Sequence, residues 1–340
     1  MAVFVKQRLE GVARMNVKIY GAGVAGTFLY FLLKQAGFDV SICERRRSSP
    51  DCRCAWGITY NEAKALYKEI DVNLDEYVLV RPANVIVNGV AFKNKNVVVF
   101  DKKRLLEDLW RRMDIEDVKA VKAQQADVLV DATGYERALL PKIENDNLYP
   151  TAQTVEEHDA DENIYVYAKG ATGYAWAFPL GDRRWHVGVG EAEGNFSALL
   201  NGLREKYGFK VNNELFCRCD AFVRLLAPSK CRPFVVGNVV GVGESIGCVS
   251  GAGEGNAPSL RCAKLFYECL KAGHFEDYER RVLRHFRWIE NEHKFVELVQ
   301  QGKLWRALPL LPRIVAVESK RAVGHSVADV RALLKLILRS

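Results

Sequence analysis

Residues 17–44 read VKIYGAGVAGTFLYFLLKQAGFDVSICE, and this stretch decides the fold that we expect. Residues 17–20 are β-prone and enter a glycine-rich turn, and residues 27–35 carry apolar side chains at helical spacing. Residues 38–43 form a second β-prone run that ends on Glu44. A strand, a GxGxxG turn, a helix, a strand and an acidic residue in this order predict a βαβ unit that binds a dinucleotide.

The glycines and the acid of this unit each have a physical role. Gly21 permits the tight turn, Gly23 lets the backbone approach a pyrophosphate, and Gly26 lets the helix pack closely on the strand. The pyrophosphate is expected at the helix N-terminus, where free N–H groups and the helix dipole attract it. Glu44 is placed to bind ribose hydroxyls, and its charge disfavours the 2′-phosphate of NADP. The motif alone does not separate FAD from NAD. The cofactor contacts expected in the turn are Gly21, Gly23, Val24, Ala25 and Gly26.

Length and composition predict a globular α/β protein of two closely packed lobes. The chain has 340 residues, which exceeds the size at which one hydrophobic core usually stops growing. No apolar run reaches the roughly 18 residues of a transmembrane helix, and the N-terminus lacks the apolar core of a signal peptide. We leave residues 1–14 out of the fold argument. Nine scattered cysteines without an export signal favour reduced thiols, so we expect a cytoplasmic protein.

The basic excess of the chain lies in its C-terminal part. Residues 261–340 hold 16 Lys and Arg against 9 Asp and Glu, which accounts for the whole net charge of +7. This part suits an anionic partner such as the inner face of a membrane, and the alternative is a solvated helical face. We find no nucleic-acid-binding motif and expect no nucleic acid as partner.

Amphipathic helices are expected after residue 271. Residues 274–301 have strongly amphipathic spacing that residues 308–312 interrupt, and residues 327–338 predict a second, basic helix. These helices either cap a cavity for a lipid tail or simply close the fold.

Two later segments combine a β-prone run with a glycine-rich turn. Residues 125–134 read QADVLVDATG, a β-branched run closed by a Thr-Gly turn that suits a backbone passing beside a ligand. Residues 237–245 read GNVVGVGES and are followed by further glycines before an expected helix over residues 257–271.

An aromatic strand is the sharpest remaining signal. Residues 174–179 read YAWAFP, and the chain continues after eight residues with Gly188-Val189-Gly190. Alternation places Tyr174, Trp176 and Phe178 on one face of the strand. An ordinary sheet face packed into the core is the alternative interpretation of this pattern.

Together these segments resemble the flavoprotein superfamily of para-hydroxybenzoate hydroxylase, and within it the archaeal geranylgeranyl reductases, which saturate isoprenoid lipid chains. The resemblance covers roughly residues 17–271. It implies FAD as cofactor and an α/β fold with a Rossmann-type FAD-binding domain, an interleaved antiparallel-sheet substrate lobe and C-terminal helices. We expect the FAD-binding domain over residues 15–140 and 230–271, the substrate lobe over residues 141–229, and the helical region over residues 272–340.

The resemblance also implies roles for individual residues. Lys102 stands where the family usually has an arginine that contacts the flavin nucleotide, and Glu244 where it usually has an aspartate near the ribityl chain. Cys54, in the segment CRCAWG, is similar to the cysteine that lies over the flavin, and we expect it to shape the flavin face and shuttle a proton. A buried, inert thiol is the alternative for Cys54. A metal site at this CxC pair would need further ligands, so no metal is expected. The FAD contacts expected beyond the first unit are Arg45, Lys102, Ala132, Thr133, Gly134, Gly243, Glu244, Gly253 and Gly255.

The function implied by the resemblance is saturation of the C=C bonds of geranylgeranyl chains in membrane-lipid biosynthesis, by hydride transfer from reduced flavin. Tyr174, Trp176 and Phe178 would hold the alkene in a dry apolar tunnel. The expected substrate is an isoprenoid lipid or a prenyl diphosphate. The expected electron donor is a transient one, ferredoxin or a nicotinamide, because no second GxGxxG follows. Two alternatives are an FAD-dependent aromatic hydroxylase, whose characteristic Asp-Gly pair the sequence lacks, and a flavin electron carrier.

Overall fold

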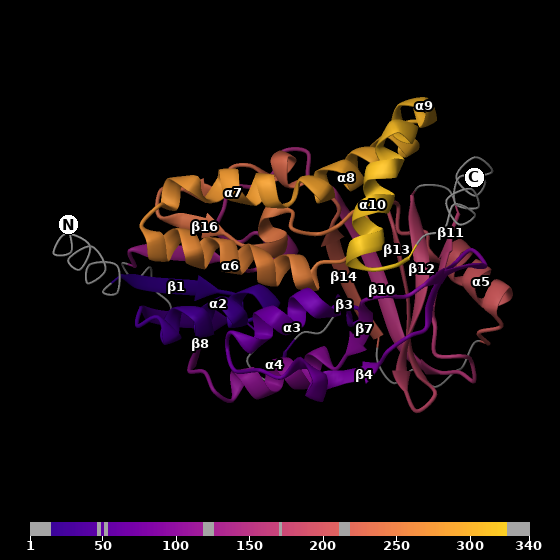
Figure 1. The fold of residues 1–340 in the computed structure, drawn as a ribbon, viewed down its shortest axis with the longest axis horizontal. Helices are drawn as coiled ribbons and strands as arrows, with labels where there is room; N and C mark the ends of the chain where they lie inside the picture. Colours follow the sequence, from indigo (N-terminus) through magenta and orange to yellow (C-terminus); the bar gives the residue numbers. More distant parts are fainter. Residues whose placement is uncertain are drawn as a thin grey trace.

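The computed structural model describes residues 15–45, 49–50, 54–117, 126–169, 172–210 and 218–324. These residues form a mixed α/β fold in which a largely parallel sheet and a largely antiparallel sheet stand at opposite ends of the molecule (Figure 1).

The first sheet carries the predicted βαβ unit. Strand β1 lies between β2 and β9 and runs parallel to both, and α2 (Val24–Gln35) connects β1 to β2. Strands β8 and β16 extend the sheet in parallel on either side, and β15 closes it antiparallel to β16. The predicted order of strand, turn, helix and strand is confirmed. The six strands, in sheet order, are β15 (Val235–Val236), β16 (Val239–Gly241), β9 (Val128–Asp131), β1 (Asn16–Tyr20), β2 (Asp39–Glu44) and β8 (Ile115–Asp117).

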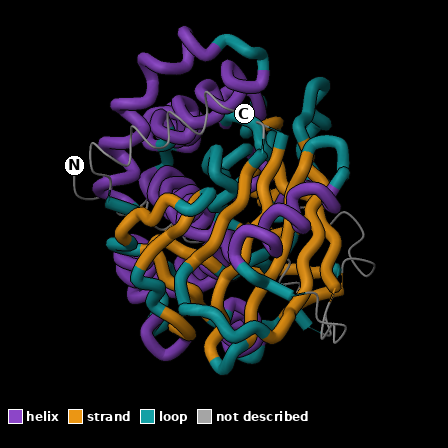
Figure 2. The backbone as a smooth tube through the Cα atoms, turned by 90° about the vertical axis from the view of Figure 1, so that its right-hand side faces the viewer, coloured by secondary structure: helices purple, strands orange, loops and turns teal. Residues whose placement is uncertain are grey.

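The second sheet has seven strands, and Figure 2 shows the long ones side by side with a helix across their outer face. That helix, α5 (Phe196–Tyr207), buries Leu199 and Leu203 against the sheet. Strand β5 pairs parallel to β11, and the other pairings are antiparallel. The sequence assigned β5 and β6 to the nucleotide-binding part, whereas the structure pairs them within this second sheet. The strands, in sheet order, are β14 (Arg218–Arg224), β10 (Leu148–Glu157), β13 (Arg184–Glu191), β12 (Gly173–Gly181), β11 (Ile164–Ala168), β5 (Asn84–Val87) and β6 (Val90–Lys93).

A small third sheet and short helices connect the two large sheets. Strand β7 pairs antiparallel with β3 on one side and with β4 on the other. The elements of this part are β3 (Gly57–Thr59), α3 (Tyr60–Lys68), η1 (Leu74–Tyr77), β4 (Val78–Val80), β7 (Val97–Phe100) and α4 (Lys102–Trp110). The remaining 3-10 helices are η3 (Gly134–Glu136), η4 (Pro228–Cys231), η5 (Gly243–Ile246), η6 (Phe275–Asp277) and η7 (Leu308–Leu310).

The interruptions between the C-terminal helices lie at other residues than the sequence predicts. The amphipathic stretch predicted over residues 274–301 is divided into two helices at Phe286, and the second ends at Gln300, as that bound predicts. The interruption lies at Gly302 and not at residues 308–312. Pro309 and Pro312 instead occupy the first turns of η7 and α10, where a missing N–H costs nothing. The helices are α6 (Asn256–Ala272), α7 (Tyr278–His285), α8 (Arg287–Gln300), α9 (Leu304–Ala307) and α10 (Leu311–Arg321). The basic helix predicted over residues 327–338 lies outside the described residues.

After α10 the chain returns to the antiparallel sheet. Val323 forms a β-bridge with Asn94, and the amide nitrogen of Lys95 donates to the carbonyl of Ala322 at 3.1 Å. The C-terminal helices are thereby tied to the turn that joins β6 and β7. No helix within the described ranges is long and apolar enough to cross a membrane.

Candidate functional site

A cavity of about 1120 Å³ lies between the two large sheets. Its wall is formed on one side by the turns that follow β1, β2 and β9, and on the other by the faces of β10, β11 and β12. Helix α8 and the end of α10 complete it. Ligands of open parallel sheets bind in this position, beyond the carboxyl ends of the strands.

The glycine-rich turn after β1 fits the pyrophosphate of a dinucleotide. Gly21 has a φ of +99°, and a Cβ built on it would lie 2.4 Å from the carbonyl oxygen of Ala132. A Cβ on Gly26 would lie 1.9 Å from the carbonyl oxygen of Gly21. A Cβ on Gly23, in contrast, has no described atom within 4 Å, and Gly23 lines the cavity at the N-terminus of α2. Two glycines are therefore required for packing, while the third leaves an open cradle where first-turn N–H groups lack helical partners.

Glu44 and Arg45 lie at the same end of the cavity. The carboxylate of Glu44 accepts a hydrogen bond from the amide nitrogen of Ala22 at 2.9 Å, so it holds the turn as well as lining the cavity. Arg45 forms a bidentate pair with Glu136, at 2.9 and 2.5 Å, on the rim of the cavity. The cofactor contacts of both residues stay predictions.

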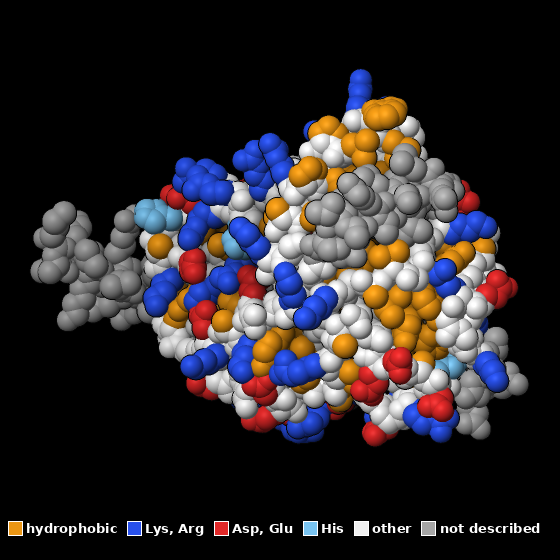
Figure 3. Space-filling model, turned by 45° about the vertical axis from the view of Figure 1, so that its right-hand side comes forward, with side chains coloured by type: hydrophobic (Ala, Val, Ile, Leu, Met, Phe, Trp, Pro, Cys, Tyr) orange, Lys and Arg blue, Asp and Glu red, His pale blue; other side chains and the backbone are white. Residues whose placement is uncertain are grey.

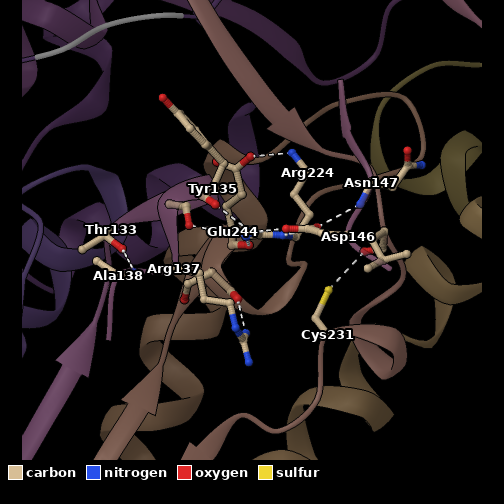
Figure 4. A network of polar contacts seen from close by, with 12 residues as sticks. Thr133, Tyr135, Arg137, Ala138, Asp146, Asn147, Arg224, Cys231 and Glu244 are labelled. Carbon is tan, nitrogen blue, oxygen red and sulfur yellow. Dashed lines mark hydrogen bonds and ion pairs between the residues drawn. The ribbon is translucent and has the colours of Figure 1, made fainter. Parts of the chain in front are cut away.

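The two later glycine-rich turns are joined by one buried arginine (Figure 4). Arg224 of β14 donates from Nη2 to the carbonyl of Tyr135 at 2.6 Å and from Nη1 to the carbonyl of Glu244 at 2.9 Å. Its amide nitrogen donates to the carboxylate of Glu244 at 2.8 Å, and Asp146 pairs with its guanidinium at 2.8 Å. Burial raises the pKa of Glu244. Arg224 therefore fixes both predicted cofactor turns to the antiparallel sheet, although a lone arginine in a strand gave no sequence signal.

Most of the predicted cofactor residues share this cavity. Ala132, Thr133 and Gly134 line it after β9, and Glu244 lines it after β16. Gly243 is not among its lining residues and packs instead against Ser259 and Ala25. The predicted residues on the cavity wall are Gly21, Gly23, Val24, Ala25, Glu44, Arg45, Lys102, Ala132, Thr133, Gly134, Glu244, Gly253 and Gly255.

The aromatic residues of β12 form one wall of the cavity, as alternation predicts. Tyr174, Trp176 and Phe178 face the cavity, whereas Ala175 and Ala177 are buried on the opposite face beneath α5. The hydroxyl of Tyr174 donates to the carbonyl of Ala252 at 2.5 Å. Burial raises the pKa of Tyr174 to about 12, so this hydroxyl keeps its proton at neutral pH. This hydrogen bond thus links the aromatic wall on β12 to the glycine-rich loop before α6.

The Gly-x-Gly pair makes room for the indole of Trp176. Gly188 of β13 lies in register between Trp176 on β12 and Gln153 on β10. A Cβ on Gly188 would lie 2.5 Å from the indole ring, and a Cβ on Gly190 would lie 3.1 Å from the Thr151 methyl. The indole therefore lies across β13 and reaches the next strand.

Gln153 connects this indole to the cysteine loop. Its Oε1 accepts from Nε1 of Trp176 at 3.1 Å, and its Nε2 donates to the carbonyl of Cys54 at 3.1 Å. Gln153 is buried at the cavity wall, so both bonds form away from bulk water. Sequence reasoning missed Gln153, because a single glutamine in a strand carries no motif.

Cys54 lies on the cavity wall beside Lys102. Nζ of Lys102 is 3.3 Å from Sγ of Cys54, and Nδ2 of Asn256 is 3.9 Å from the same sulfur. Asn256, in the first turn of α6, also donates to the carbonyl of Gly57 at 2.9 Å. Cys54 is only half-buried, which disagrees with an inert core thiol. Its neighbour Cys52 lies outside the described residues.

A cluster of charged side chains lies between the glycine-rich loop and α10. The carboxylate of Glu254 accepts from the amide nitrogen and the hydroxyl of Thr59, at 3.1 and 2.8 Å, and pairs with Arg321. Arg321 also pairs with Glu318 at 2.9 Å, and its guanidinium stacks 4.1 Å from the ring of Trp288. Glu254, Glu318 and Arg321 all line the cavity.

Glu292 of α8 is the most buried acid of this cluster. It accepts from the amide nitrogen of Gly251 at 2.9 Å. Burial, reinforced by the charge of Glu318, raises the pKa of Glu292 to about 8. This carboxyl group therefore carries a proton at neutral pH, directly behind the glycine-rich loop.

No family model matches this chain. An uncharacterized protein of Methanocaldococcus jannaschii is 24% identical, over 87% of this chain and 93% of that protein. Digeranylgeranylglycerophospholipid reductase 1 of Methanopyrus kandleri is 26% identical, over 52% of this chain and 57% of that protein.

Solved structures share the fold over most of the chain. A geranylgeranyl bacteriochlorophyll reductase-like protein of Thermoplasma acidophilum superimposes with a TM-score of 0.71 at 15% identity, over 95% of this chain and 96% of that one. The chain resembles the geranylgeranyl reductases. A probable FAD-dependent monooxygenase of Pseudomonas aeruginosa has a TM-score of 0.63 at 15% identity, over 88% of this chain and 100% of that one. The likeness to geranylgeranyl reductases expected from the sequence is thus confirmed.

Proposed function

We propose that this chain is an FAD-dependent oxidoreductase that saturates C=C bonds of isoprenoid chains. The observation that carries the proposal is the single connected cavity that has the nucleotide cradle of Gly23 at one end and the wall of Tyr174, Trp176 and Phe178 at the other. A Rossmann-type domain would hold FAD through the turn after β1, with Glu44 on the adenosine ribose. The similarity to a digeranylgeranylglycerophospholipid reductase and to a geranylgeranyl reductase-like structure supports an isoprenoid substrate.

The shape and lining of the cavity suit a long apolar substrate. Beyond the aromatic wall, the lining is aliphatic on β5 and β11 and continues with Phe295, Val296 and Val299 of α8. These surfaces would exclude water and align an alkene along the wall. The substrate we propose is an isoprenoid lipid or a prenyl diphosphate.

When bound and reduced, FAD supplies a hydride to one alkene carbon, and a proton must reach the other carbon. The thiol of Cys54 would hold this proton at Sγ, and Lys102 lies close enough to replace it from Nζ at 3.3 Å. Gln153 would keep the Cys54 loop and the indole of Trp176 in fixed relation. Ferredoxin or a nicotinamide would reduce the flavin transiently.

Product mass tests this proposal directly. The purified protein should be yellow with non-covalent FAD and, after anaerobic reduction by dithionite, should add two hydrogens per double bond to a geranylgeranyl lipid. A gain of one oxygen on an aromatic substrate would instead support a hydroxylase. Protein that takes up no FAD when it is added would contradict the proposal altogether.

A further inference from the structure

Helix α9 forms a projection that ends in an exposed tryptophan. Trp305 is 87% exposed, against 45% for Phe222 and 41% for Val236, the other large apolar side chains that stand out from the described surface. Figure 1 shows α9 standing away from the body of the molecule. In Figure 3 hydrophobic side chains gather on the projection at the top of the view, with a Lys or Arg side chain beyond them. An exposed indole is costly in water, and among the residues that the structure describes Trp305 is left largely uncovered.

The charges around Trp305 have one sign. Lys303, Arg306 and Arg313 flank it and are exposed, and the sequence has no acidic residue between Glu297 and Glu318. Leu304, Leu308 and Leu310 are half-buried beside it, and Pro309 is exposed. Residues 303–313 are hereafter called the α9 projection. They combine the amphipathic indole of Trp305, aliphatic side chains, and a basic border formed by Lys303, Arg306 and Arg313.

The α9 projection is continuous with the wall of the cavity. Helix α8 supplies Phe295, Val296, Val299 and Gln300 to the cavity lining, and α9 begins four residues after Gln300, at Leu304. The exposed indole therefore follows the cavity-lining helix after one short polar turn, residues 301–303.

We propose that the α9 projection inserts into the interfacial layer of an anionic lipid bilayer, with Trp305 at headgroup depth and the three basic side chains on lipid phosphates. Tryptophan favours this layer, and basic residues near an anionic surface are attracted to it. Insertion of the α9 projection would bring the cavity close to the bilayer that would hold an isoprenoid lipid substrate. This consequence rests on the proposed function. Membrane binding itself does not depend on turnover.

An acidic protein such as a small electron carrier would also be attracted by the basic border. The geometry favours a bilayer, because α9 stands away from the body of the molecule and carries one strongly exposed indole among basic side chains. A single protruding indole beside half-buried leucines instead matches an interfacial anchor.

Co-sedimentation of the full chain with vesicles tests the proposal. The wild-type protein should bind mixed phosphatidylglycerol and phosphatidylcholine vesicles at low salt and bind less as salt rises. Trp305→Ala should lower the bound fraction severalfold, whereas Val236→Ala, which removes an exposed apolar side chain elsewhere, should not. Each of Lys303→Gln, Arg306→Gln and Arg313→Gln should weaken binding about fivefold, since a basic residue near an anionic surface contributes about 1 kcal/mol. Lys142→Gln, which removes an exposed charge from the segment between η3 and β10, is the charge control.

Three outcomes would overturn the proposal. In the first, the wild-type protein fails to bind anionic vesicles at low salt. In the second, Trp305→Ala binds vesicles as the wild type does, whereas truncation after Gly324 abolishes binding. In the third, Trp305→Ala would leave vesicle binding intact but raise the KM for reduced ferredoxin. Trp305→Ala and the wild type should turn over detergent-dispersed substrate equally well. Absence of turnover in both proteins would contradict the proposed function and not the membrane contact.

Discussion

Gly188 leaves the space into which the indole of Trp176 extends, since a Cβ there would lie 2.5 Å from the ring. This relationship explains why a Gly-x-Gly follows the aromatic strand at a fixed distance. In an antiparallel pair the number of intervening residues sets which residue of β13 lies opposite Trp176, and the structure puts Gly188 in that position.

Gly188→Ala should displace the indole and impair turnover while FAD stays bound. A displacement of about 1 Å in substrate placement lowers turnover by as much as about 100-fold. Gly190→Ala should have a smaller effect, because its Cβ would lie 3.1 Å from the Thr151 methyl and 3.7 Å from the indole of Trp176, which is ordinary contact distance. Flavin absorbance and steady-state kinetics of both variants provide the measurement, and equal losses in the two would contradict the assigned role of Gly188.

Gln153→Leu should break both bonds that connect Trp176 to the Cys54 loop. We expect kcat to fall about tenfold or more with FAD retained, and Cys54 to react faster with iodoacetamide because its loop is released. Gln153→Glu keeps the acceptor for Trp176 and should restore part of kcat without restoring the slow thiol reaction. If Gln153→Leu changes Tm but leaves kcat and thiol reactivity unaltered, Gln153 contributes to packing and does not position Trp176 and the Cys54 loop.

Gly23→Val and Gly26→Ala should separate binding from folding. The side chain of Gly23→Val would enter the open cradle, so FAD is lost while the Tm of the FAD-free protein is unchanged. Gly26→Ala would place a Cβ 1.9 Å from the carbonyl oxygen of Gly21, so the fold itself is destabilised by about 3 kcal/mol or more. Thermal melts of both FAD-free variants against the wild type test this pair, and the reverse order of effects would refute the assignment.

Glu292→Gln should change how stability depends on pH. The pKa of Glu292 is raised from 4.5 to about 8, so its neutral form stabilises the fold fully below pH 4.5, and this contribution is lost as pH rises through about 8. The groups facing it are Glu254, Glu318 and Arg321. Glutamine keeps the neutral shape, so the variant should lose less Tm than the wild type between about pH 5 and pH 8. Parallel Tm curves would show that Glu292 does not titrate in this range.

Local patterns predicted the parts of the fold that depend on neighbouring residues. The periodicity of residues 17–44 predicted β1, α2 and β2, and alternation predicted which face of β12 lines the cavity. The pairing of β5 with β11 could not be predicted, because it joins segments about 80 residues apart and local periodicity carries no information on such partners.

The site residues that the sequence missed act through long-range contacts. Glu254 and Arg321 are 67 residues apart, and Gln153 is 99 residues from Cys54. None of them belongs to a spaced motif, since each is one polar side chain whose partner is supplied by another element. The glycines and aromatic residues could be predicted because their roles depend on backbone geometry and strand alternation, and both leave a recognisable local pattern in the sequence.

The return of the chain from α10 to the turn after β6 has a consequence for biosynthesis. The βαβ unit emerges from the ribosome before β16, which extends its sheet, and before Arg321 and the bridge between Val323 and Asn94, which complete the cavity. Because domains generally fold from the N-terminal side during translation, the nucleotide cradle is assembled before the last wall of the cavity exists. Under the proposed function, FAD would therefore load before the space for the substrate is enclosed.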